Sequence, residues 1–257
     1  MKPTQRESLA QDLYNALDTA KPIDRLTAQY DLTIEDAYRI QDHFLTERLT
    51  AENQIVGHKI GLTSDGIQSQ LGVSEPDFGR LLSDMHVEAP TINTESLINP
   101  RIEPEIGFLL EESLEAPVTY FDVLDATASV FPVFEIIDSR IADWDIRIQD
   151  TIADNASAGL FTTGEVLTDP SGIDLSFEGV KLWKNGQVEA SGIGEHVLGH
   201  PAKAVAWLAN TLDAMGDSVE ANEIILSGSF TPAVDISSGD VLTAEFSRIG
   251  SVTVVVD

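Results

Sequence analysis

The first fifty residues carry apolar positions at helical spacing. Three leucines recur every four residues within 5–20 and predict an amphipathic helix there. Thr33 followed by Asp36 matches a capping box, which predicts that a second helix begins at this point. We therefore expect a helical N-terminal section, residues 1–54, packed on the rest of the chain.

From residue 55 onward the pattern changes to short apolar runs separated by turn residues, which is typical of strands. Residues 55–64 are predicted to form a strand that turns into a loop, and residues 72–85 are predicted to be a turn-rich loop. The apolar run 129–141 predicts another strand, with Pro132 favouring an edge or a strand start. Residues 55–257 are expected to form one β-rich domain, which makes a single functional unit with the N-terminal section.

Two local signals in the second half of the chain are specific for a type of secondary structure. Asn185-Gly186 is the strongest short signal for a β-hairpin. Pro201 and Gly216 enclose an apolar stretch, as residues in the first turn and just after the last turn of a helix do. We expect one further helix there, followed by strands to the end of the chain.

Two glutamates lie two residues apart in one of the predicted strands. Residues 99–110 read NPRIEPEIGFLL, in which Glu103 and Glu105 interrupt an apolar run. Because side chains alternate along a strand, both carboxylates point to the same face. Two like charges held that close repel each other unless a cation, a proton or a basic partner lies between them. The pair is either an exposed acidic edge or part of a site for a hard divalent cation.

Three further residues bear on this choice. Glu135 lies in the apolar run VFEII, where a lone carboxylate is costly unless it is bound, so it is the candidate third ligand. Lys59 is internal to a predicted strand and needs an acidic or anionic partner, unless its side chain reaches solvent. Asp77, in the turn-rich segment, is either a turn former or an acid of the site.

The overall charge bears on which carboxylates are candidates for a functional site. Of 257 residues, 43 are Asp or Glu and 15 are Lys or Arg, which gives a formal net charge of -28. The acids are spread along the chain, as in adaptation to high salt, where screening relieves self-repulsion. Such a surface repels nucleic acid and anionic membranes, so neither is expected as a partner. Only carboxylates inside apolar strands are therefore candidates for chemistry.

Cysteine is absent from the sequence. This excludes disulfides, thiolate metal sites and cysteine nucleophiles. No apolar run has the length of a signal-peptide core or a membrane span, so a cytoplasmic location is expected.

Five motifs, in this order, resemble the 2-keto-4-pentenoate hydratase group of the fumarylacetoacetate hydrolase superfamily: KIGLTS, EPDFG, RIEPEIGF, FEIIDSRIADWDIRIQDTIADNASAG and LSGSFTPAV. The resemblance extends from about residue 5 to the end of the chain. It implies an α+β fold, with a mixed β-roll or barrel core and flanking helices. It also implies Mg²⁺ or Mn²⁺ held by an E-x-E pair and a third acid, positions that Glu103, Glu105 and Glu135 match.

The same resemblance implies roles for other residues. Lys59 and Asp77 are expected to be catalytic. Substrate contacts are expected from residues of the KIGLTS, NASAG and GSFT motifs, namely Leu62, Ser157, Ser229 and Thr231. Relatives assemble into dimers and up to decamers and can form a complex with a pathway neighbour, so a homo-oligomer is expected.

The expected reaction is the metal-dependent addition of water to a small-molecule 2-hydroxy-2,4-dienoate in the catabolism of aromatic compounds. Two alternatives share the fold and the metal: a 4-oxalocrotonate-type decarboxylase and a hydratase of a longer dicarboxylate of the 2-oxohept-3-enedioate type. A dicarboxylate needs a second cationic group, for which the candidates are Arg80, Arg101, Arg140 and Arg147. A C–C bond hydrolase using His43 and Glu47, and a metal-binding partner subunit without activity, are less favoured.

Overall fold

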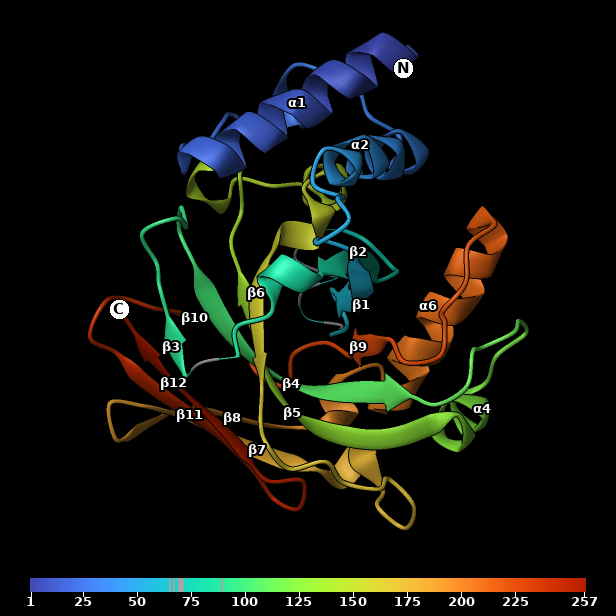
Figure 1. Cartoon of the computed structure of the whole chain (residues 1–257), viewed down its shortest axis with the longest axis vertical. Coiled ribbons are helices and arrows are strands. Elements are labelled where there is room, and N and C mark those ends of the chain that lie inside the picture. Colours follow the sequence, from blue (N-terminus) through green and yellow to red (C-terminus); the bar gives the residue numbers. More distant parts are fainter. Residues whose placement is uncertain (65, 67, 69–71, 89) are drawn as a thin grey trace.

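A large sheet forms the middle of the molecule (Figure 1). The computed structural model describes residues 1–64, 66, 68, 72–88 and 90–257. Within this part of the chain, seven strands pair in the order β2-β1-β9-β4-β5-β6, and β10 pairs with β4. The strands are β1 (Ile55–Gly61), β2 (Asp77–Leu82), β4 (Arg101–Leu110), β5 (Thr127–Ile137), β6 (Ala158–Thr163), β9 (Ile224–Leu226) and β10 (Val234–Asp235).

A second sheet lies at the lower left of Figure 1, in the order β3-β12-β11-β7-β8. In β12, alternate residues are buried and exposed, so one face of this sheet packs inward. The predicted hairpin at Asn185-Gly186 is confirmed: both residues have positive φ, 52° and 77°, and they join β7 to β8. The strands are β3 (Thr91–Ile92), β7 (Gly179–Lys184), β8 (Gln187–Ile193), β11 (Val241–Phe246) and β12 (Ser251–Val256).

The helices lie at one end and along one side of the sheets (Figure 1). The predicted cap of the second helix is confirmed, because the backbone N–H of Asp36 donates to Thr33 Oγ1 at 3.0 Å. The predicted later helix begins at Pro201, and Gly216 ends it with a φ of 81°. The helices are α1 (Pro3–Thr19), α2 (Ile34–Thr46), α4 (Tyr120–Asp125), α5 (Ile148–Ala153) and α6 (Pro201–Met215). These elements, with the mixed sheets, confirm the expected α+β class.

The prediction of a loop over residues 72–85 is wrong for its second half. Asp77–Leu82 forms strand β2, which pairs antiparallel with β1. The turn residues Pro76 and Gly79 dominated the local signal, whereas pairing with a distant strand and burial of Phe78 and Leu81 decide the conformation.

The expectation for Pro132 is confirmed in part: the residue is not at the start of β5, but it pairs with β4 alone, at a point that the β6 ladder does not reach. Pairing with β6 ends at Val133 and Thr163, and beyond it the Gly164 N–H donates to the Pro132 carbonyl at 2.7 Å. The missing N–H of proline therefore falls just past the end of the β6 ladder, where it interrupts no pairing.

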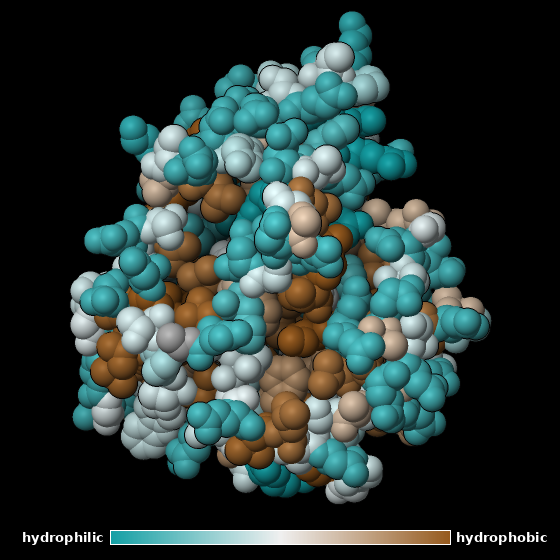
Figure 2. All heavy atoms as spheres, viewed as in Figure 1, coloured by the Kyte–Doolittle hydropathy of each residue, from teal (hydrophilic) through white to brown (hydrophobic). Residues whose placement is uncertain are grey.

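Figure 2 shows hydrophilic residues over the helical end of the molecule and hydrophobic residues gathered across the middle of the same face. The buried core is apolar and draws on both sheets and all the long helices. Among the described residues, no helix combines the length and the apolar character that crossing a membrane requires.

Candidate metal and catalytic site

The three predicted metal ligands come together on two neighbouring strands. In the register of β4 and β5, Glu103 lies directly opposite Glu135, and Glu105 follows two residues along the same face. One carboxylate oxygen from each of the three lies within 4.8 Å of the others. Glu105 and Glu135 are each only 1% exposed, and Glu103 is half-buried. The acidic-edge interpretation is therefore wrong.

The electrostatics of this cluster fit a bound divalent cation. Burial, followed by repulsion from Glu135, raises the pKa of Glu103 to about 7 and the pKa of Glu105 well above its ordinary value. Burial also raises the pKa of Glu135, although Lys59 opposes the shift. Neither Glu135 oxygen has a hydrogen-bond partner among the described residues beyond its ion pair with Lys59. Oxygen ligands gathered in this way are what Mg²⁺ and Mn²⁺ prefer.

A backbone N–H of the segment after β9 holds one carboxylate of the cluster in place. The Gly228 N–H donates to Glu105 Oε2 at 2.8 Å. Gly228 has a φ of 107°, and a Cβ there would lie 2.3 Å from Thr63 Oγ1. Glycine is therefore required for this segment to pass close to Thr63 while its N–H holds Glu105.

Lys59 has the acidic partner that its internal position called for. Its Nζ is 3.1 Å from Glu135 Oε1 and donates to the Ala156 carbonyl at 3.0 Å. Burial alone would lower the pKa of Lys59, but the surrounding carboxylates, Glu135 first, raise it above its ordinary value. The side chain is therefore an ammonium held beside the three glutamates.

Asp77 lies on the same face as Lys59, because its partner in the register of β1 and β2 is Gly61, two residues beyond Lys59. Burial raises the pKa of Asp77, and the Lys59 charge lowers it in opposition. Within the described part of the chain, Asp77 Oδ2 is buried and accepts no hydrogen bond. An unengaged carboxylate oxygen beside an ammonium is suited to accept a proton from a substrate or water.

The four predicted substrate contacts lie on segments beside this site. Leu62 follows β1 with a φ of 57°, and Ser157 follows Ala156, whose carbonyl binds Lys59. The Ser229 hydroxyl donates to the Thr231 carbonyl at 2.7 Å, within the segment that supports Glu105. Their contact with a substrate remains a prediction.

The partners of the four arginines distinguish them as candidates for the second cationic group that a dicarboxylate substrate needs. Arg80 pairs with Asp42 and Asp217, and Arg140 is buried against Asp154. Arg147 is exposed. Arg101 lies on the Glu103 face of β4, pairs with exposed Asp235 and stacks on Trp144 at 4.7 Å. The Arg101 charge also lowers the pKa of Glu103.

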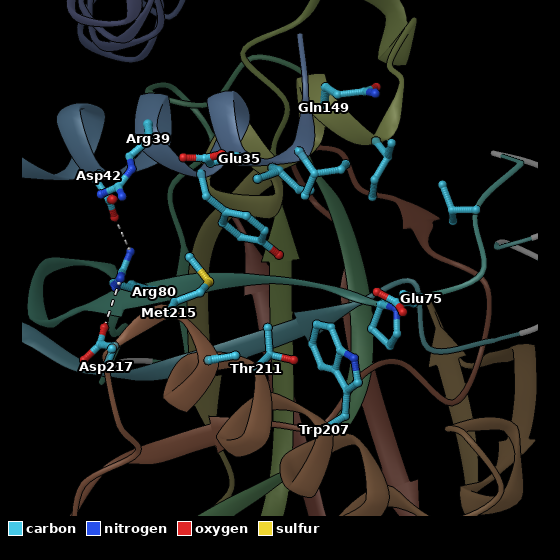
Figure 3. Close-up of a pocket in the computed structure, with 18 of the residues that line it drawn as sticks. Glu35, Arg39, Asp42, Glu75, Arg80, Gln149, Trp207, Thr211, Met215 and Asp217 are labelled. Atoms are coloured by element: carbon cyan, nitrogen blue, oxygen red, sulfur yellow. Dashed lines mark hydrogen bonds and ion pairs between the residues drawn. The ribbon is translucent and has the colours of Figure 1, made fainter. Parts of the chain in front are cut away.

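A groove of about 970 Å³ lies between α2, α6 and residues 73–76 (Figure 3). Arg80 crosses it, with ion pairs of 3.0 Å to Asp42 and 3.1 Å to Asp217. Arg80 is three residues from Asp77 on β2, so the two side chains point to opposite faces. None of the three glutamates is among the described residues that line this groove.

Sequence reasoning missed the residues that support the site from α5 and the segment after it. Thr151 Oγ1 is 3.4 Å from Ser157 Oγ, and its hydroxyl lowers the pKa of Asp77. Asn155 binds the backbone of Arg80 through both side-chain atoms. The run of small residues at 155–159 indicates close backbone approach. It does not show what approaches, because Asp77 and Arg80 belong to β2, which is distant in the sequence.

Known proteins resemble the chain in sequence and in structure. The family model of the fumarylacetoacetate (FAA) hydrolase C-terminal region matches residues 81–257. A 2-hydroxyhexa-2,4-dienoate hydratase of Comamonas testosteroni is 46% identical over 253 residues, 96% of each chain. A 2-keto-4-pentenoate hydratase of Paraburkholderia xenovorans (strain LB400) is 44% identical over 255 residues, 98% of this chain and 95% of the relative.

One solved structure superposes on the whole chain. It is a 4-oxalocrotonate decarboxylase from Pseudomonas putida G7, complexed with magnesium and adipate, with a TM-score of 0.96 and 34% identity. The match covers 100% of this chain and 99% of the decarboxylase.

Proposed function

Since this chain belongs to the fumarylacetoacetate hydrolase family, we propose that it is a divalent-metal-dependent hydratase of a 2-hydroxy-2,4-dienoate, of the 2-oxopent-4-enoate type. The observation that carries the proposal is the approach of three carboxylates to within 4.8 Å, beside the buried Lys59 and Asp77. The product is a 4-hydroxy-2-oxo acid, formed in the catabolism of aromatic compounds.

Glu103, Glu105 and Glu135 would hold the metal. When bound, a divalent cation supplies positive charge that orients the substrate carboxylate and 2-oxygen and polarises the latter. The protein contributes the remaining parts of the chemistry through Lys59 and Asp77. Mg²⁺ or Mn²⁺ is the proposed native ion, in keeping with the all-oxygen ligand set.

The proposed reaction has two proton-transfer stages. In the first, the 2-hydroxyl loses its proton and the terminal alkene carbon gains one, which gives a conjugated enone. In the second, water adds its oxygen to C4 and a proton to C3. Negative charge develops on the 2-oxygen in both, where the Lys59 ammonium stabilises it. Asp77 moves protons between carbon and water, and the alternative that Lys59 is the base is disfavoured because its raised pKa keeps it protonated.

The first experiment is a steady-state assay with 2-hydroxypenta-2,4-dienoate, with and without Mg²⁺ or Mn²⁺, in which NMR identifies the product. We expect metal-dependent formation of 4-hydroxy-2-oxopentanoate. Glu135→Gln should lose Mn²⁺ binding and activity together, whereas Asp77→Asn should bind Mn²⁺ normally and lose at least about 10²-fold in kcat. Exposed Glu111, changed to Gln, is the matched control. A fully active Asp77→Asn would remove Asp77 from the mechanism.

The decarboxylase alternative rests on the structural match over the whole chain. Loss of CO₂ from 4-oxalocrotonate also leaves negative charge on the 2-oxygen, so the same residues could serve. The second arm of the assay therefore uses 4-oxalocrotonate. Release of CO₂ without hydration of the pentadienoate would make the protein a decarboxylase.

We further propose the setting in which the enzyme works. It acts in the cytoplasm as a homo-oligomer, between a dimer and a decamer, and associates with a pathway neighbour. Residues 1–54 form a helical section packed on a catalytic domain of residues 55–257. Its net charge of -28 suits high salt.

A further inference from the structure

Three consecutive residues beside the site adopt a backbone conformation that side chains disfavour. Asn155, Ala156 and Ser157 have φ values of 53°, 49° and 54°. In this left-handed region the Cβ crowds the following carbonyl, so residues other than glycine visit it singly rather than in runs. Such a turn persists only where surrounding contacts hold it, and it commonly marks a functional site.

One buried guanidinium holds both ends of this left-handed turn. Arg140 donates to the Asp154 carbonyl on one side and to the Ala158 carbonyl on the other, the latter at 2.9 Å. It also forms an ion pair with the Asp154 carboxylate, and both side chains are almost fully buried. The two carbonyls that flank residues 155–157 are therefore tied to one rigid, planar group.

Asn155 ties the turn to the outer edge of the large sheet. Its Oδ1 accepts from the Arg80 N–H at 2.8 Å, and its Nδ2 donates to the Arg80 carbonyl at 2.9 Å. The side-chain amide thus makes the two backbone hydrogen bonds to β2 that a neighbouring strand would otherwise make. Gly79 permits the approach, because a Cβ there would lie 2.4 Å from the Asn155 carbonyl oxygen.

The turn delivers a single carbonyl to the site, that of Ala156, which accepts from Lys59 Nζ at 3.0 Å. Glu135 Oε1 lies 3.1 Å from the same nitrogen as an ion pair, without a hydrogen bond between the two groups in the described part of the chain. An ammonium has three N–H groups in a fixed tetrahedral arrangement. One of them is held by the Ala156 carbonyl, and the charge of Glu135 keeps the ammonium on the side of the carboxylates.

We propose that Asn155 is a positioning residue for Lys59: by holding the left-handed turn against β2, it places the Ala156 carbonyl that fixes the Lys59 ammonium beside Glu135. The inference rests on the proposed function for the role of Lys59 in turnover. The orientation of Lys59 itself does not depend on that function, so it can be measured separately.

The test compares two asparagines of the same geometry. Asn155→Gly keeps the left-handed backbone accessible and removes only the side-chain bonds. Asn185→Gly is the matched control, because Asn185 has a φ of 52° and also makes two side-chain hydrogen bonds, to Asp240 and Val241, on the β7–β8 hairpin. If Asn155→Gly does not fold, Asn155→Asp, which keeps the acceptor for Arg80, takes its place.

Two readouts are needed. The first is NMR of metal-free protein labelled at the lysine side-chain nitrogens, in which Lys59 is assigned by its loss in Lys59→Met. We expect a distinct, slowly exchanging Lys59 ammonium signal that shifts or disappears in Asn155→Gly and persists in Asn185→Gly. The second is kinetics, in which we expect kcat to fall about 10²-fold in Asn155→Gly, with KM and Mn²⁺ affinity changed by less than about threefold.

An unchanged Lys59 signal in folded Asn155→Gly would overturn the inference, whatever the activity. An altered signal with unchanged kcat would overturn it as well, because the placement of the ammonium would then not matter to turnover. Absence of hydratase activity in the unaltered protein would instead contradict the proposed function. In that case the NMR comparison alone decides whether Asn155 orients Lys59.

Discussion

At the scale of single residues, the missing side chain of Gly61 lets the two catalytic candidates lie together. Gly61 is the partner of Asp77 in the strand register and is two residues from Lys59. A Cβ at this position would lie 2.3 Å from Asp77 Oδ1 and 3.5 Å from Lys59 Nζ. Because neighbouring backbone and buried side chains surround Asp77, its carboxylate has little room to yield.

Gly61→Ala should therefore displace Asp77 and lower kcat by about 10–10²-fold, with a loss of about 1–3 kcal/mol in the free energy of unfolding. Mn²⁺ binding should remain, because the atoms nearest the new methyl group belong to Asp77 and Lys59 and not to Glu103, Glu105 or Glu135. Steady-state kinetics, urea unfolding and Mn²⁺ titration measure the three effects. In the control Gly179→Ala, the added Cβ meets only the Ser247 hydroxyl and the Gly192 carbonyl in the second sheet. Equal loss of kcat in both variants would contradict the argument.

At the scale of elements, the register of β4 against β5 creates the cluster, because it sets Glu103 opposite Glu135 on a shared face. The pKa of each of its three carboxyl groups is raised, that of Glu103 to about 7. A carboxyl group whose pKa is higher in the folded state stabilises the fold at low pH, and this contribution is lost as pH rises through the folded pKa. Ionisation of the cluster in the metal-free protein therefore destabilises these two strands.

Metal binding requires the ionised carboxylates, so protons and metal compete. Between about pH 5 and pH 8, Mn²⁺ affinity should rise, and the Tm of Mn²⁺-loaded protein should increasingly exceed that of metal-free protein. Thermal unfolding with EDTA or with Mn²⁺ across this range measures the gap, and calorimetry in buffers of different ionisation enthalpy measures proton release. A gap that stays constant with pH would show that the carboxylates are already ionised in the metal-free protein.

At the scale of the whole molecule, self-repulsion is the main consequence of a net charge of -28. The helical end that Figure 2 shows as hydrophilic carries acidic and basic residues together, so most of the excess negative charge lies in residues 55–257. Salt reduces this repulsion, since the Debye length falls from about 10 Å at 0.1 M to about 3 Å at 1 M.

Raising NaCl from about 0.05 M to about 1 M at neutral pH should therefore raise the Tm of the metal-loaded protein, and most of the rise should come below about 0.5 M, where screening changes fastest. The control is the metal-free protein near its sequence pI of about 4.2, where the net charge is small and the salt effect should be weak. Differential scanning calorimetry measures both. A Tm that does not respond to salt at neutral pH would contradict adaptation to high salt.

The sequence by itself determined the features that depend on near neighbours. Apolar spacing and caps predicted α1, α2 and α6, and Asn185-Gly186 predicted its hairpin, because a turn or a helix end is decided within a few residues. Alternation along a strand put Glu103 and Glu105 on one face, and the cost of a lone buried carboxylate singled out Glu135.

Only the tertiary structure decided the features that join distant segments. Pairing with β1 made Asp77 the start of a strand rather than part of a loop, and β5 carries Pro132 in its interior because β6 ends beside it. The left-handed turn at 155–157 exists because Arg140 and the edge of β2 hold it. Such contacts arise between residues tens of positions apart, so no local pattern encodes them; they determine where the Lys59 ammonium lies.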